Sequence, residues 1–276
     1  MIRRMLLLVL MMALAASSTI GQDAPSPEDI ALEAIANAGT YLNLSGLGLS
    51  ELPAEVGRLN RLEALHVQQN DLTSLPPEIG QMPPLVTLWA YDNEITALPP
   101  EIGQLHYLRN LSLSENRLTS LPDEIGDLFN LTNLQLEGNQ LRELPAAIGE
   151  LRNLDTLNLA RNDLNTLPDE IGNLLNLRLL DLRDNNLERL PCSAMNLYQL
   201  DLIDLRGNPI SFPPADVIDS GPAAMRDYLA QHCNEPGGPD LALILIALVL
   251  ATVGGLMLFG VYRQQNVVKT KRKVQS

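Results

Sequence analysis

Apolar side chains in the middle of the chain recur with a period of 23 residues. A clean copy begins at Leu108, taken as position 1, and follows the pattern L-x-x-L-x-L-x-x-N-x-L-x-x-L-P-x-x-I-G-x-L-x-x. Because side chains alternate along a strand, leucines at positions 4 and 6 predict a short strand with one buried face. The apolar residues at positions 1, 11, 14, 18 and 21 are expected to fill the same interior from the turns and the opposite side.

The polar and special residues of the pattern predict how each copy turns. Asparagine stands at position 9 in seven copies: Asn70, Asn93, Asn116, Asn139, Asn162, Asn185 and Asn208. Its amide both donates and accepts, so this asparagine ladder is expected to satisfy turn backbone groups in neighbouring coils. The proline at position 15 suits the first turn of a short helical segment, and the glycine at position 19 is expected to adopt a positive φ and end that segment.

The repeated pattern is identified as a leucine-rich repeat. One coil cannot bury its leucines alone, so eight stacked coils over residues 39–214 are predicted to share one core. The expected fold class is an α/β repeat solenoid, with a curved parallel β-sheet on the concave face and short helical or 3₁₀ segments on the convex face. The recurring L-P-x-x-[IV]-G-x-[LM] segment resembles the 23-residue repeats of the Ras-suppressor and Shoc-type group, of plant Ras-group proteins and of many bacterial proteins.

Both ends of the repeat array depart from the pattern as capping segments do. Residues 22–38 are predicted to form an N-terminal cap, with an amphipathic helix over residues 27–36. Residues 215–234 are predicted to form a C-terminal capping helix, with apolar residues of the stretch from Gly221 to Cys233 at helical spacing.

The chain termini predict a membrane protein. Residues 1–21 combine Arg3 and Arg4 with a short apolar run and small residues, as a secretory signal peptide does; an uncleaved anchor is the alternative. After a linker over residues 235–240, residues 241–262 form an uncharged stretch long enough for a transmembrane helix. The basic tail, residues 263–276, is expected in the cytoplasm. These segments predict a single-pass type I protein of the cell membrane, with an extracellular or periplasmic repeat domain.

Charge separates the repeat domain from the tail. All 33 acidic residues lie between Asp23 and Asp240, and all three lysines lie in the tail. So acidic a surface argues against nucleic acid as a partner. Ala247, Ala251 and Gly255 are four residues apart in the predicted span, a spacing that would let two helices approach and form a homodimer. Small residues are also common in such helices without that role.

No catalytic motif is present in the sequence. It contains no phosphate-binding Gly-Lys-Ser/Thr loop, no nucleophile elbow and no HExxH motif. The sequence therefore predicts a protein that is not an enzyme, with no cofactor and no metal site.

The outward strand positions supply the candidate binding residues. Trp89, the only tryptophan, is predicted to be exposed beside Tyr91 and next to His66. Exposed aromatic residues on a rigid sheet are typical anchors at protein interfaces; packing of a lone aromatic ring on its neighbours is the alternative. The candidate ligand-binding residues on the concave face are His66, Trp89, Tyr91, Ser112, Gln135, Arg161 and Arg183.

Acidic and basic residues alternate on the C-terminal half of the same face. Asp181, Arg183, Asp204 and Arg206 follow one another at equivalent positions of two repeats. They are interpreted as an internally neutralised ladder, with a polar contact surface as the alternative.

Two cysteines flank the end of the array. Cys192 follows the proline of the seventh repeat and Cys233 ends the predicted closing helix, so outside the cell a disulfide between them is one prediction. Two separate thiols are the other.

These features lead to one leading hypothesis for function. It is a membrane-anchored protein that recognises or adheres to a protein ligand through its concave face. The alternatives are a structural envelope spacer without a specific ligand, or an intracellular-type signalling scaffold if the signal-peptide prediction is wrong.

Overall fold

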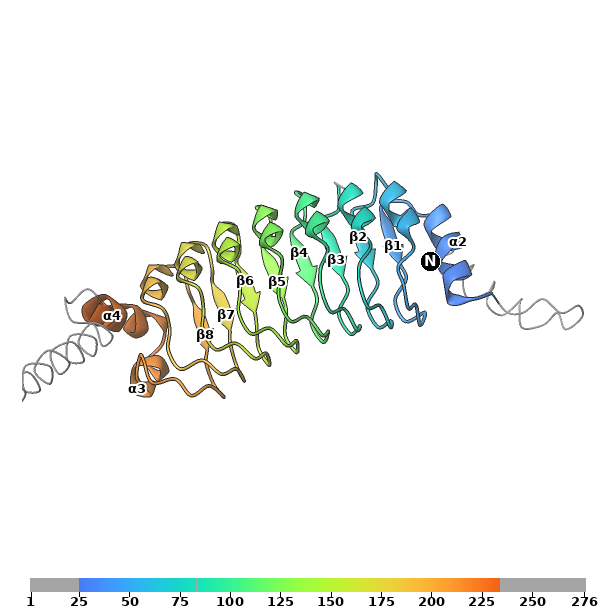
Figure 1. Ribbon diagram of the computed structural model, residues 1–276. Helices are drawn as coiled ribbons and strands as arrows, with labels where there is room; N and C mark the ends of the chain where they lie inside the picture. Colours follow the sequence, from blue (N-terminus) through green and yellow to red (C-terminus); the bar gives the residue numbers. More distant parts are fainter. Residues whose placement is uncertain (1–24, 83, 234–276) are drawn as a thin grey trace, which may run out of the picture.

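The computed structural model describes residues 25–82 and 84–233, which form one continuous solenoid (Figure 1). Its eight short strands pair in parallel, in sequence order, as a single sheet. The strands are β1 (Tyr41–Asn43), β2 (Ala64–His66), β3 (Thr87–Trp89), β4 (Asn110–Ser112), β5 (Asn133–Gln135), β6 (Thr156–Asn158), β7 (Leu179–Asp181) and β8 (Leu202–Asp204). On the convex side run seven 3₁₀ segments: η1 (Ala54–Arg58), η2 (Pro77–Gln81), η3 (Pro100–Gln104), η4 (Asp123–Asp127), η5 (Ala146–Glu150), η6 (Asp169–Asn173) and η7 (Cys192–Asn196).

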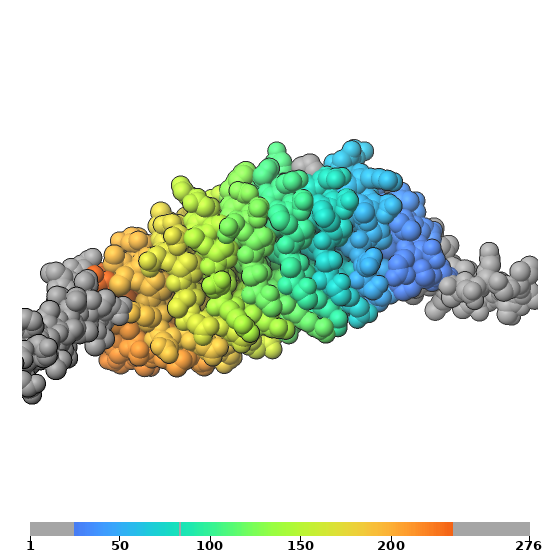
Figure 2. All heavy atoms as spheres, viewed as in Figure 1, coloured from blue at the N-terminus to red at the C-terminus, as the bar shows by residue number. Residues whose placement is uncertain are grey.

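The register of the sheet follows the sequence repeat. Each strand residue pairs with the residue 23 positions further on, as Leu88 pairs with Leu111. The apolar positions of the pattern are buried along the whole array, which confirms the predicted interior. Figure 2 shows that side chains close the spaces between coils, so the stacked turns form a continuous body. The fold is therefore the predicted parallel sheet backed by short 3₁₀ segments.

The asparagines at position 9 link neighbouring coils from inside the turn. The Asn116 side-chain oxygen accepts a hydrogen bond from the backbone N–H of Ile95, 2.9 Å away in the preceding repeat. Its Nδ2 group donates to the carbonyl oxygens of Ala90 and Leu113, at 2.9 and 3.0 Å. Because Asn116 is buried, these bonds satisfy backbone groups that water cannot reach.

Residues at position 8 adopt the left-handed backbone region in all eight repeats. Glycine occupies this position in three repeats, but the others carry ordinary side chains with positive φ: Gln69, Asp92, Glu115, Arg161 and Asp184. This conformation costs a non-glycine residue energy. The bond that Asn93 and its equivalents make to the position-6 carbonyl, three residues back, closes the turn and holds it.

The glycines at position 19 correct one expectation. Gly57, Gly80, Gly103, Gly126, Gly149 and Gly172 do not adopt a positive φ. They are required by close packing instead, because a Cβ atom on Gly126 would lie 2.7 Å from the backbone oxygen of Ala147 in the next coil. The glycine of the recurring Ile-Gly pair thus lets neighbouring 3₁₀ segments approach each other, rather than ending each segment.

The repeat prolines differ slightly from expectation. Pro122 lies one residue before η4, with an extended ψ of 154°, instead of within its first turn. Its carbonyl oxygen accepts the first hydrogen bond of the segment, from Ile125 at 3.1 Å.

Helices cover both ends of the described array. Helix α2 (Pro27–Ala36) packs on β1 and η1 through Ala31 and Ile35, and Ser26 and Asp29 form a capping box at its start. At the other end, one closing helix was expected and two are present, α3 (Ala215–Asp219) and α4 (Pro222–Cys233). Gly221, with a φ of 95°, separates them. Helix α4 packs on η7, burying Met225 and Leu229.

Cys192 and Cys233 are joined by a disulfide, with 5.8 Å between their Cα atoms. The bond ties the start of η7 to the end of α4. Among residues 25–82 and 84–233, no helix is long and apolar enough to cross a membrane. The predicted signal peptide, linker, transmembrane helix and tail lie outside the described residues, and with them the homodimer prediction.

Candidate functional site: the concave face

Three rings from the first three strands form an aromatic cluster at the N-terminal end of the concave face. His66 stacks on Trp89, with ring centroids 4.0 Å apart and planes 16° from parallel. Tyr41 meets the edge of His66 at 5.0 Å between centroids, and its hydroxyl lies 3.2 Å from His66 Nδ1. We call Tyr41, His66 and Trp89 the aromatic cluster.

The strand register explains why these rings meet. His66 and Trp89 occupy position 5 of consecutive repeats and are direct partners between β2 and β3. Neighbouring strands are about 4.8 Å apart, whereas alternate residues of one strand are separated by about 6.6 Å. Cross-strand stacking is therefore closer than any contact along one strand, and a flat ring pair results.

The aromatic cluster remains accessible to a partner. Trp89 is 38% exposed and Tyr41 is 52% exposed. His66 is half-buried between them, and this burial lowers its pKa below the usual value of 6.5. At neutral pH the cluster is thus an uncharged, partly open aromatic surface.

Of the two expected neighbours of Trp89, His66 is in ring contact with it. The sequence predicts Trp89 beside Tyr91 and next to His66, and the stacked ring in the described part of the chain is that of His66. Tyr91 is half-buried at position 7 of the same repeat. Tyr41 was not among the candidate residues, although aligning the repeats places it at position 3, diagonal to His66 on the next strand.

Gln68 is a buried polar residue of the strand segment that carries His66. It follows His66 by two residues at outward position 7, yet it is only 8% exposed. Its side-chain Oε1 is buried and has no hydrogen-bond partner. A buried acceptor without a partner is unusual in a folded protein and calls for an explanation.

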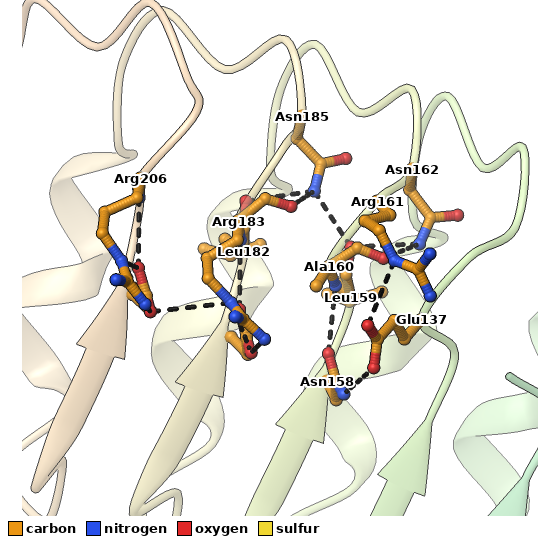
Figure 3. A network of polar contacts seen from close by, with 12 residues as sticks. Glu137, Asn158, Leu159, Ala160, Arg161, Asn162, Leu182, Arg183, Asn185 and Arg206 are labelled. Carbon is orange, nitrogen blue, oxygen red and sulfur yellow. Dashed lines mark hydrogen bonds and ion pairs between the residues drawn. The ribbon is translucent and has the colours of Figure 1, made fainter.

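The C-terminal half of the concave face is occupied by ion pairs, two within single coils and one between neighbouring coils (Figure 3). Arg183 binds Asp181 at 2.7 Å and approaches Asp204 at 3.6 Å, and Arg206 binds Asp204 at 2.5 Å. The hydrogen bond from Arg206 holds the pKa of the Asp204 carboxyl below its usual value. The predicted alternation of charges is present here as a chain of paired groups.

The remaining candidate residues lie between these two regions. Arg161 binds Glu137 at 3.1 Å (Figure 3) and also Glu115, two repeats away, and these carboxylates raise its pKa. Gln135 donates to Asn133 at 2.6 Å. Ser112 ends β4 beside Trp89 in the register and is half-buried. Arg161, Arg183 and Gln135 are thus already engaged by the protein itself.

Residues 25–82 and 84–233 contain no group of three or more His, Cys, Asp and Glu side chains placed to hold a metal ion.

Comparison with known families identifies the class of protein. Residues 30–112 and 99–162 match the family described as "Leucine-rich repeat region", and residues 149–210 match the family "Leucine rich repeat". Together with the repeated coil geometry, these matches show that the chain belongs to the leucine-rich repeat proteins.

Three solved structures resemble this chain. A leucine-rich repeat protein of Leptospira interrogans is 36% identical with a TM-score of 0.63, over 70% of this chain and 48% of that one. The plant peptide hormone receptor RGFR1 in complex with RGF2 is 30% identical with a TM-score of 0.50, over 57% of this chain and 30% of that one. A plant ice-binding protein is 29% identical with a TM-score of 0.51, over 57% and 53%.

The chain spans about half the length of the Leptospira protein that it resembles. Among curated protein sequences, none matches the chain.

Proposed function

We propose that this protein is a non-catalytic recognition protein that binds a protein or peptide ligand on its concave face. The observation that carries the proposal is the aromatic cluster, a stack of rings left 38–52% exposed at Trp89 and Tyr41 on a rigid sheet. Large aromatic side chains on preorganised surfaces supply much of the binding energy of protein interfaces.

The two halves of the concave face differ in what they can offer a ligand. Arg183 and Arg206 are paired with carboxylates of their own repeats, so a ligand would have to compete with bonds already made. The aromatic cluster makes no such ion pair, so a ligand can contact its apolar surface without displacing an existing bond. The N-terminal half is therefore the proposed docking region, and the C-terminal half is its polar flank.

Structural relatives support recognition as the general role. RGFR1 is a peptide hormone receptor with this fold, whereas the plant ice-binding protein has the same fold and binds ice. Because one fold accommodates such different ligands, the argument for a protein ligand rests on the aromatic cluster and not on fold alone.

We place this recognition outside the cell, on a protein anchored by one transmembrane helix. The terminal segments of the sequence support this placement, as does the Cys192–Cys233 disulfide, since such bonds persist mainly in oxidising compartments.

The proposal is tested with the full chain, purified in mild detergent and used to capture surface proteins of its source. Two variants run in parallel: Trp89→Ala in the aromatic cluster, and Tyr198→Ala, an aromatic residue that is 70% exposed and lies beside η7 on the convex side. A partner retained by the native chain and Tyr198→Ala but lost with Trp89→Ala is expected. The purified partner should then change the fluorescence of Trp89, the only tryptophan.

A different outcome would favour the alternative, a rigid spacer without a specific ligand. If the native chain and both variants capture the same proteins, or none, the concave aromatic site has no role in binding. A rigid spacer without a specific ligand would then be the better description.

A further inference from the structure

The geometry points to an arginine side chain of the ligand as the group that the aromatic cluster and Gln68 bind. This inference rests on the proposed function and names the chemistry of its docking point. It starts from the buried Oε1 atom of Gln68, which has no hydrogen-bond partner within the protein, so a ligand N–H group that reached it would satisfy it.

Gln68 belongs to the same small area of the concave face as the rings. It lies two residues after His66, and side chains two apart in an extended segment face the same side. The backbone N–H of Gln69 donates to the carbonyl oxygen of Tyr91 at 3.1 Å, which places the turns of the two repeats side by side. Positions 5 and 7 of the second and third repeats therefore form one patch: His66, Gln68, Trp89 and Tyr91.

The charge around this patch favours a cation. In the first three repeats, positions 2, 3, 5, 7 and 8 carry Glu63 and Asp92 but no arginine or lysine. His66 adds no positive charge at neutral pH, because its burial disfavours the protonated form. Over the described residues as a whole, 30 acidic side chains face 12 arginines. An anionic ligand group would thus be repelled here and a cationic one attracted.

Guanidinium combines the three properties that the patch demands. It is planar and stacks on aromatic faces, it donates up to five hydrogen bonds, and it is always charged. Lysine is charged but not planar, so it lacks the stacking contact. A neutral amide or urea group can stack and donate, but it gains nothing from Glu63 and Asp92.

The test uses the fluorescence of Trp89, the only tryptophan in the chain and a member of the patch. The full chain is titrated with N-acetylarginine amide and with the matching lysine and citrulline compounds. We expect the arginine compound to bind at least about threefold more tightly than the lysine compound and about tenfold more tightly than the uncharged citrulline compound.

Two substitutions of the same kind separate a specific contact from a general charge effect. Gln68→Glu replaces the buried amide by a carboxylate that can bind guanidinium bidentately, and should tighten binding of the arginine compound about tenfold. Gln140→Glu makes the same change at an exposed position of the fifth repeat and should leave the affinity unchanged. Circular dichroism establishes that both variants are folded.

Two results would overturn the inference: no fluorescence response to the arginine compound, or equal affinities for all three compounds. An unchanged affinity in Gln68→Glu would remove Gln68 from the site. Failure here is distinguishable from failure of the proposed function, because a protein partner that depends on Trp89 can exist without arginine selectivity. Conversely, an arginine-selective response without any protein partner would support the arginine-binding site but contradict the proposed role in protein recognition.

Discussion

At the scale of single residues, the glycines at position 19 show that a small side chain can be required by its neighbour rather than by its own backbone. A Cβ atom at Gly126 would fall 2.7 Å from a backbone oxygen of the next coil, and the other glycines of this position are similarly enclosed. Neither the oxygen nor the coil that carries it can move without disturbing the stack.

Gly126→Ala should therefore destabilise the protein by about 3 kcal/mol, the cost expected for overpacking against backbone. Gly39→Ala is the matched control, since a Cβ atom there has nothing within 4 Å and its φ is not left-handed. Urea unfolding followed by circular dichroism measures both. Equal stability of the two variants would contradict the packing explanation.

The lowered pKa of His66 makes the stability of the protein depend on pH. Burial lowers its pKa in the folded protein below 6.5, so the unfolded chain takes up the proton more readily. The contribution of His66 to stability is therefore complete above pH 6.5 and declines as the pH falls through its folded pKa.

The measurement is an NMR titration of the His66 ring in the native chain and in Trp89→Ala. Removing the stacked indole exposes the imidazole, so the pKa should move back towards 6.5 in the variant. An unchanged pKa would show that the stack with Trp89 does not cause the shift.

The residues that sequence analysis predicts best are those whose role repeats. The leucines and asparagines were assigned because seven copies carry the same side chain at the same position. The left-handed position 8 could not be found this way, because glutamine, aspartate, glutamate and arginine share it with glycine. Tyr41 and Gln68 were missed for a related reason: each occurs once, and its importance depends on a neighbour in the adjacent coil.

At the scale of elements, the C-terminal cap is the least regular part of the described fold. Its two helices replace the single helix expected, because Gly221 turns the chain between them. Periodicity alone predicts the apolar side of α4 but not the break, since the break depends on Gly221 and Pro222 and not on the apolar spacing. The disulfide then joins the two elements that pack together, η7 and α4.

Replacing Cys192 and Cys233 together by serine should lower the free energy of unfolding by about 2–4 kcal/mol, the range for closing a loop of this size. The loss should concentrate at the cap, so amide hydrogen exchange is expected to accelerate most in α4 and η7. Uniform acceleration along the array, or no change in stability, would show that the disulfide does not hold the cap in place.

At the scale of the whole molecule, the coils interact almost entirely with their immediate neighbours. Contacts between strands, and between 3₁₀ segments, link consecutive repeats. The bond from Arg161 to Glu115, two repeats away, is a side-chain exception on the surface. Stability should therefore be close to a sum over repeats and their interfaces.

Deleting residues 131–153 removes one complete repeat and joins equivalent positions of its neighbours. The shortened protein is expected to fold, to keep its aromatic cluster and to unfold at a moderately lower urea concentration. Deleting residues 131–141 instead breaks the 23-residue register and should abolish cooperative unfolding. A full-repeat deletion that fails to fold would contradict the additive description.

The glycines of the convex side also bear on the radius of the solenoid. An array of coils curves when its outer side is spaced more widely than its sheet, and bulky side chains between the outer segments would widen that spacing. Gly126 and its equivalents place no side chain between the outer segments, so this spacing stays small. The array accordingly follows a gentle arc (Figure 1). A shallow arc favours a ligand laid along its length over a round one gripped within it.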